Sequence, residues 1–155
     1  MAQQRIRIVT FNVYMNKCRG PATDFLDINK DLQQKVPVLV FTQEDSDQTE
    51  TLRRLNAVYN GGFNPLCAST ECGPGQTVGC YYANMSTKQL KCDERFAFAH
   101  HRCAICVTVY PNPNPNKRVI RICNLHLNGG RNTDRELLLF NFDDMLENKL
   151  AILKL

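Results

Sequence analysis

The chain has 155 residues, of which 43% are hydrophobic and 22% are charged. This is ordinary globular usage over the length of about one domain, so composition argues against intrinsic disorder. No apolar run approaches the roughly 20 residues that a membrane-spanning helix needs. Nineteen basic and 15 acidic residues give a net charge of +4, which permits a phosphate-bearing partner, nucleic acid included, without requiring one.

The eight cysteines bear on both compartment and metal binding. Because the first residues lack a charged leader followed by an apolar stretch, we expect reduced thiols in an intracellular protein, cytoplasmic or nuclear. The spacing Cys103-Ala-Ile-Cys106 resembles half of a zinc site, although it lies in an apolar run typical of a strand. The other candidate zinc ligands are Cys67, Cys72, His100 and His101. A cysteine/histidine zinc protein is therefore one alternative hypothesis.

The first half of the chain predicts alternating strands and helices. The expected elements are a strand at 5–11, a helix at 22–35, a strand at 36–41 and a helix from Asp47 to about Tyr59. The first strand is rich in β-branched residues, and Pro37 limits the first helix. The run 36–41 is continuously apolar, as in strands buried on both faces. Asp47 with Glu50 three residues later is typical of a helix start.

The second half predicts mostly strands and a final helix. We expect a loop at 63–76, a strand at 77–82, two strands at 103–110 and 118–125 around a proline-rich loop at 111–116, and a helix from the capping box at 133–136 onward. This order indicates an α/β or α+β fold with a mixed sheet flanked by helices. Residues 1–155 are expected to form a single domain.

Three apolar strands end on polar residues, which are Asn12, Glu44 and His126. Each of these residues shares strand parity with apolar residues of its own strand, so each is expected to point the way its buried neighbours point. Ligands collect at the carboxyl ends of strands in open α/β sheets. The sequence therefore predicts that the three side chains meet at one rim.

These three residue types suit a phosphoryl group and a divalent metal. Glu44 could hold Mg²⁺ or Mn²⁺, His126 could donate to a phosphate oxygen, and the Asn12 amide could donate without adding negative charge. Each residue also has a simpler interpretation. Glu44 would then be a solvated loop carboxylate, His126 a hydrogen-bonded structural residue and Asn12 a turn residue.

Four short motifs carry a family resemblance. They are Ile8-Val-Thr-Phe-Asn12, Val38-Leu-Val-Phe-Thr-Gln-Glu44, Arg102-Cys-Ala104 and Cys123-Asn-Leu-His-Leu-Asn-Gly-Gly130. In order and spacing they resemble the endonuclease/exonuclease/phosphatase superfamily, which includes DNase I-like nucleases, sphingomyelinases and inositol polyphosphate phosphatases. The resemblance implies a Mg²⁺-dependent phosphoesterase fold, a sandwich of two sheets with helices outside.

The resemblance also implies roles for particular residues. Glu44 would be the metal ligand, Asn12 would sit beside the metal-bound phosphate, and His126 would contact the scissile phosphate. Substrate contacts would come from Arg102, from Asn124 in the motif of His126, from Tyr81 or Tyr82, and from Arg131. Arg131 could equally be a solvated turn residue.

The sequence departs from the family pattern in one important respect. The Gly-Asp-x-Asn and Ser-Asp-His motifs, which would supply the general base and a second histidine, are not in it. The chain is therefore expected to be a truncated, first-half domain with impaired or partner-dependent activity. A half sandwich exposes a sheet face. We expect self-association, a second polypeptide, or repacking by 63–76 and 83–100 to cover that face.

The leading hypothesis is a Mg²⁺-dependent phosphoesterase or nuclease-like hydrolase acting on a phosphodiester or phosphomonoester. The alternative is a catalytically inactive truncated relative that serves as a binding or structural component. Substrate choice lies in loops, so nucleic acid, phospholipid and inositol phosphate all remain candidate substrates.

Overall fold

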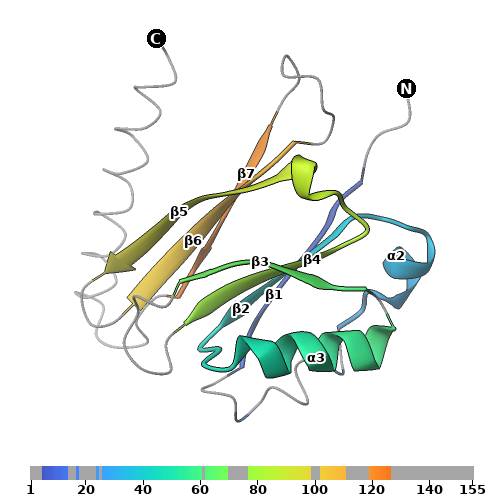
Figure 1. Ribbon diagram of the computed structural model, residues 1–155, viewed down its shortest axis with the longest axis horizontal. Helices are drawn as coiled ribbons and strands as arrows, with labels where there is room; N and C mark the ends of the chain where they lie inside the picture. Colours follow the sequence, from blue (N-terminus) through green and yellow to red (C-terminus); the bar gives the residue numbers. More distant parts are fainter. Residues whose placement is uncertain are drawn as a thin grey trace.

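The computed structural model describes residues 5–13, 17, 24, 26–60, 62–69, 77–98, 102–110 and 119–126, without the side chains of 94–98 and 102. Within these residues the fold is mixed α/β, with two sheets and two α-helices (Figure 1). Two predicted elements, the proline-rich loop at 111–116 and the helix from residue 133, lie outside the described residues.

The first sheet is mixed and has the strand order β1-β2-β4-β3. Its strands are β1 (Arg7–Asn12), β2 (Val38–Gln43), β3 (Asn64–Ser69) and β4 (Val78–Ala83). β1 and β2 run parallel, whereas β4 is antiparallel to both β2 and β3. Because β1 and β2 run parallel, their carboxyl ends lie at the same edge of the sheet.

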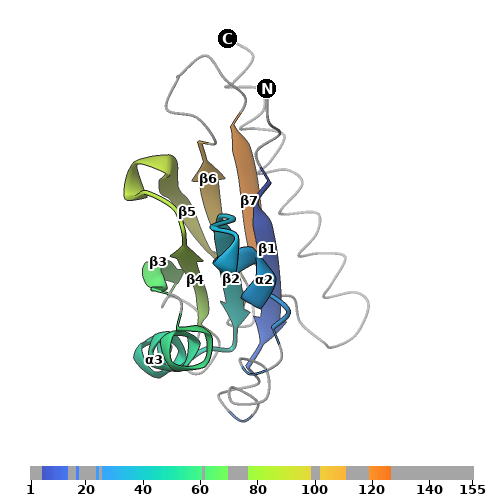
Figure 2. The same cartoon turned by 90° about the vertical axis from the view of Figure 1, so that its right-hand side faces the viewer.

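The second sheet is antiparallel and has the order β5-β6-β7. Its strands are β5 (Leu90–Phe98), β6 (Arg102–Val109) and β7 (Ile120–Leu125), and the short 3-10 helix η1 (Thr87–Gln89) precedes β5. β3 contacts β5 and β6, β4 contacts β6, and β2 contacts β7. The two sheets therefore pack face to face, with β1 and β7 side by side (Figure 2).

Two helices cover the other face of the first sheet. They are α2 (Asn29–Gln33) and α3 (Gln48–Tyr59). The predicted start of α3 is confirmed, because the Asp47 side chain accepts a hydrogen bond from the Glu50 N–H and so satisfies one of the first-turn donors. Asn60 ends α3 in the left-handed conformation that helix ends commonly adopt.

Hydrophobic residues form two cores, one on each face of the first sheet. Leu39 and Phe41 of β2 face the second sheet and pack with Ile105 of β6. Val38 and Val40 alternate with them and pack against the helices. This double burial explains the continuous apolar run of β2, since both parities of the strand face a core.

Two expectations about the elements are corrected, and one strand was not predicted. The segment 63–76 was expected to be a loop, but its residues 64–69 form β3. The segment 83–100 carried no assigned element, but it contains β5. The helix expected at 22–35 is α2 at Asn29–Gln33, within a segment that the structure describes in part.

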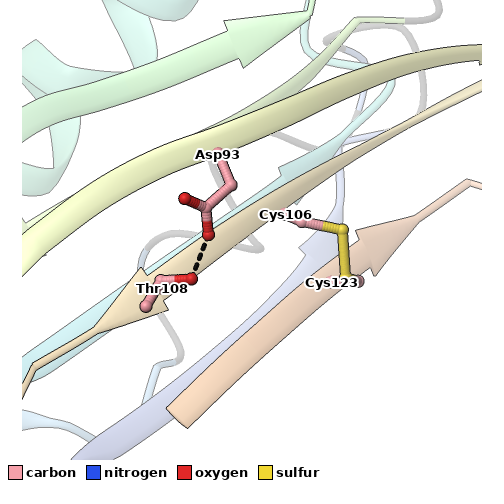
Figure 3. The surroundings of a disulfide bond; sticks show 4 residues. All are labelled: Asp93, Cys106, Thr108 and Cys123. Carbon is pink, nitrogen blue, oxygen red and sulfur yellow. Dashed lines mark hydrogen bonds between the residues drawn. A yellow bond between two sulfur atoms is a disulfide. The ribbon is translucent and has the colours of Figure 1, made fainter. Parts of the chain in front are cut away.

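The expectation of reduced thiols is also wrong for part of the chain. Cys106 and Cys123 are direct partners across β6 and β7 and form a disulfide (Figure 3). The expected intracellular location rested partly on reduced thiols, so it loses one of its supports. In the described part of the chain, neither helix has the length and apolar character needed to cross a membrane.

Candidate functional site

The site lies where β1 and β2 end, next to the end of β7. Asn12 is the last residue of β1 and pairs with Gln43, the last residue of β2. The Val13 N–H donates to the Gln43 carbonyl at 2.9 Å and extends the pairing by one step. Glu44 follows Gln43 directly, so Asn12 and Glu44 belong to one rim, as predicted.

An ion-pair contact joins this rim to the second sheet. Nε2 of His126 lies 2.9 Å from Oε1 of Glu44, and both residues are largely buried, at 7% and 9% exposure. The His126 N–H donates to the Cys103 carbonyl at 3.1 Å, which fixes the backbone of His126 against β6. The contact therefore joins a carboxylate and an imidazole that come from two different sheets.

Asn124 connects the same two sheets rather than facing an open surface. Its Nδ2 donates to the Thr42 carbonyl at 3.0 Å, and its Oδ1 accepts from Gln43 Nε2 at 3.1 Å and from Thr10 Oγ1 at 3.4 Å. Only 6% of Asn124 is exposed. The expected substrate contact is therefore replaced by a structural role, in which Asn124 places β7, and with it His126, against β2.

Glu44 reaches His126 by a route that strand parity does not predict. Val38 and Val40 face the helices, so regular alternation would send position 44 toward the helices as well. Instead, Glu44 has a positive φ of 54°, in the left-handed region. The chain turns at this residue, and its carboxylate meets the second sheet. Glu44 and His126 therefore meet as expected, but the parity argument for Glu44 is wrong.

Asp45 is the residue that sequence reasoning missed. It is fully buried, and its carboxylate accepts hydrogen bonds from Thr42 Oγ1 at 3.0 Å, Thr51 Oγ1 at 2.9 Å and the Tyr81 hydroxyl at 2.8 Å. One sequence signal could have indicated its burial. Asp45 lies directly between a buried strand and a helix start, where the chain is still inside the core.

Tyr81 therefore belongs to the core and not to the substrate surface. It is 2% exposed, and its hydroxyl also donates to the Gln48 carbonyl at 3.3 Å. Burial, followed by the nearby Asp45 charge, raises the pKa of Tyr81 above its usual range, so the hydroxyl stays a donor. Tyr82 is no substitute, because it is 7% exposed and packs in the core between the sheets.

The two expected arginine contacts lie at the limits of the described chain. Arg102 is the first residue of β6, next to Cys103, which bonds the His126 backbone. Its backbone is therefore close to the rim, while its side chain is outside the description. Arg131 lies outside the described residues.

The fit of a divalent cation depends on Glu44. Among the described residues, no group of three or more His, Cys, Asp or Glu side chains could hold a metal ion. A carboxylate has about four acceptor positions on its two oxygens, and the His126 contact uses one of them. Mg²⁺ characteristically uses one or two carboxylates and completes its shell with water and substrate phosphate. A site of this sparse kind is compatible with Glu44, whereas a preformed protein cage is not.

The chain matches no protein-family model, no curated protein and no solved structure. The resemblance to the endonuclease/exonuclease/phosphatase superfamily therefore rests on the four sequence motifs alone.

Proposed function

We propose that the protein is a Mg²⁺-dependent phosphoesterase whose substrate binds at the rim formed by Asn12, Glu44 and His126. The observation that carries the proposal is the 2.9 Å contact between Glu44 and His126, which brings an acid and an imidazole together from two different sheets. The motif resemblance supports it, because the same two residues hold the metal and contact the phosphate in that family pattern.

Each residue would act on a phosphate in a simple way. Glu44 would hold Mg²⁺, which when bound supplies positive charge to offset the charge that develops on phosphorus oxygens. A protonated His126 ring would have two N–H groups, and Glu44 would accept from one of them, so the ring would be oriented before substrate arrives. Asn12 would donate an amide N–H to a phosphate oxygen, and water would attack phosphorus in line.

Turnover by this chain alone is expected to be slow. The resemblance implies a general base on a Gly-Asp-x-Asn motif, which residues 1–155 do not contain. A positioned base typically contributes a factor of about 10²–10⁴ in rate. A second polypeptide that supplies this motif would then be needed for full activity.

The second candidate is a non-catalytic phosphate-binding component. It is favoured by one observation, namely that the only rim carboxylate described already bonds His126. This candidate predicts phosphate binding without turnover.

The test is hydrolysis of bis-nitrophenyl phosphate and of plasmid DNA with added Mg²⁺. We expect Glu44→Gln and His126→Asn each to lower the rate by about 10²-fold or more, since each removes a group that acts on the phosphate. Glu50→Gln is the matched control, because Glu50 pairs with Arg53 on the exposed side of α3. Wild-type hydrolysis that survives both rim substitutions would contradict the proposal. Phosphate binding without any hydrolysis would favour the second candidate.

A further inference from the structure

The buried Asp45 carboxylate is the group nearest the rim that the proposed chemistry does not use. Burying a charged carboxylate is unfavourable unless hydrogen bonds replace the lost water. At Asp45 three hydroxyls do so, and they come from three different elements: Thr42 from β2, Thr51 from α3 and Tyr81 from β4. Asp45 therefore ties the β2–α3 turn to the sheet and to the helix.

The surrounding chain is shaped to make room for this network. A Cβ atom at Gly79 would lie 2.8 Å from Thr42 Oγ1 and 3.4 Å from the Tyr81 hydroxyl. An alanine at position 79 would thus overlap Thr42 Oγ1, one of the three donors, and would touch the Tyr81 hydroxyl. The Asp45 N–H also donates to the Thr77 carbonyl at 2.9 Å, so both the backbone and the side chain of Asp45 are held.

Asp45, the acceptor at the centre of this network, directly follows Glu44, whose backbone is left-handed. A non-glycine residue at positive φ is unfavourable, and it persists where the surrounding structure over-determines it. Gln43 is held on one side, by β1 and β7, and Asp45 is held on the other. The two residues that flank Glu44 therefore fix its backbone conformation.

We propose that Asp45 is a positioning residue, which through Thr42, Thr51 and Tyr81 holds Glu44 in the left-handed turn that directs its carboxylate at His126. The consequence for hydrolysis rests on the proposed function. The geometric consequence does not, and it can be measured separately.

The test follows the His126 Nε2–H by ¹H,¹⁵N NMR at one fixed pH. The hydrogen bond to Glu44 should slow the exchange of this proton with water. We expect Tyr81→Phe and Thr51→Val, which keep shape but remove one donor each, to speed its exchange about 10-fold or more. Asp45→Asn, which alters the acceptor itself, should have the same effect.

Tyr59→Phe is the matched control. It also removes a tyrosine hydroxyl with two hydrogen bonds, to the N–H and the carbonyl of Leu26, but away from the rim. Its His126 signal should exchange as in wild type. Folded Tyr81→Phe and Thr51→Val proteins with wild-type exchange would overturn the proposal, whatever happens to Asp45→Asn.

A kinetic measurement separates the two proposals. If the wild type hydrolyses phosphoesters, Tyr81→Phe should lower kcat and leave KM nearly unchanged, because Tyr81 does not touch substrate. A wild type without hydrolysis, together with faster His126 exchange in Tyr81→Phe, would remove the proposed function and keep Asp45 as the positioning residue. A fall in kcat with unchanged His126 exchange would remove Asp45 from that role.

Discussion

Glu44 shows at the residue scale how a correct contact can be predicted by an incomplete argument. Its position after a buried strand indicated a rim, and the structure brings it to His126. Strand parity could not give the direction of its side chain, because parity ends with the strand and Glu44 lies in a left-handed turn. That turn depends on Asp45 and its hydrogen bonds to α3 and β4, and the partner in β4, Tyr81, is 36 residues away in sequence.

Gly79 offers a residue-scale test of this network. Gly79→Ala should lower the free energy of unfolding by about 1–3 kcal/mol, because the added methyl group overlaps Thr42 Oγ1. In a Thr42→Ala background the same change should be nearly neutral, since the clashing atom is gone. Urea denaturation of the four proteins measures this. An equal cost of Gly79→Ala in both backgrounds would contradict the packing described here.

At the scale of elements, amphipathic and fully apolar segments were predictable and irregular strands were not. β2 and α3 follow from an apolar run and from a cap at Asp47. β3 was hidden by Pro65, which is tolerated because β3 lies at the edge of its sheet and has a register shift beside that residue. β5 was hidden by consecutive charged residues and by a register shift between Cys92 and Glu94. Asp93 at this shift bonds Thr108 of the neighbouring strand (Figure 3).

The disulfide between β6 and β7 gives an element-scale prediction. It joins residues 17 positions apart, and a loop of this size corresponds to about 3 kcal/mol in the chain-entropy account. We expect Cys106→Ala/Cys123→Ala to lower the free energy of unfolding by about that amount. Cys92→Ala, which removes a free thiol, should cost much less. Alkylation of both Cys106 and Cys123 in the unreduced protein, read by mass spectrometry, would contradict the disulfide.

At the scale of the whole molecule, the side of the sandwich formed by β1 and β7 determines how the protein can associate with partners. Within the described residues, β1 pairs only with β2 and β7 only with β6, so both are edge strands. A cavity of about 440 Å³, lined mainly by apolar side chains, lies along them. Ile8, Val119 and Ile120 are 46%, 53% and 42% exposed. Such edges and apolar side chains favour association.

We expect the purified protein to self-associate through this side. Ile120→Lys should shift it toward monomer, because a charge replaces an apolar contact. Val58→Lys changes an exposed apolar residue on α3 and should not. Size-exclusion chromatography with light scattering measures the mass. A wild type that stays monomeric at all concentrations and binds no hydrophobic dye would contradict the prediction of self-association. It would also remove the support for a separate polypeptide that covers this side.

The most direct test of the account is a double-mutant cycle across the two sheets, with Glu44→Ala, His126→Ala and the combined variant in urea denaturation. Each single change leaves a largely buried partner without its counterpart. The account therefore predicts that the two single losses in the free energy of unfolding sum to more than the loss in the double variant, by about 1–2 kcal/mol. Costs that add within about 0.5 kcal/mol would show that Glu44 and His126 do not form one unit at the rim.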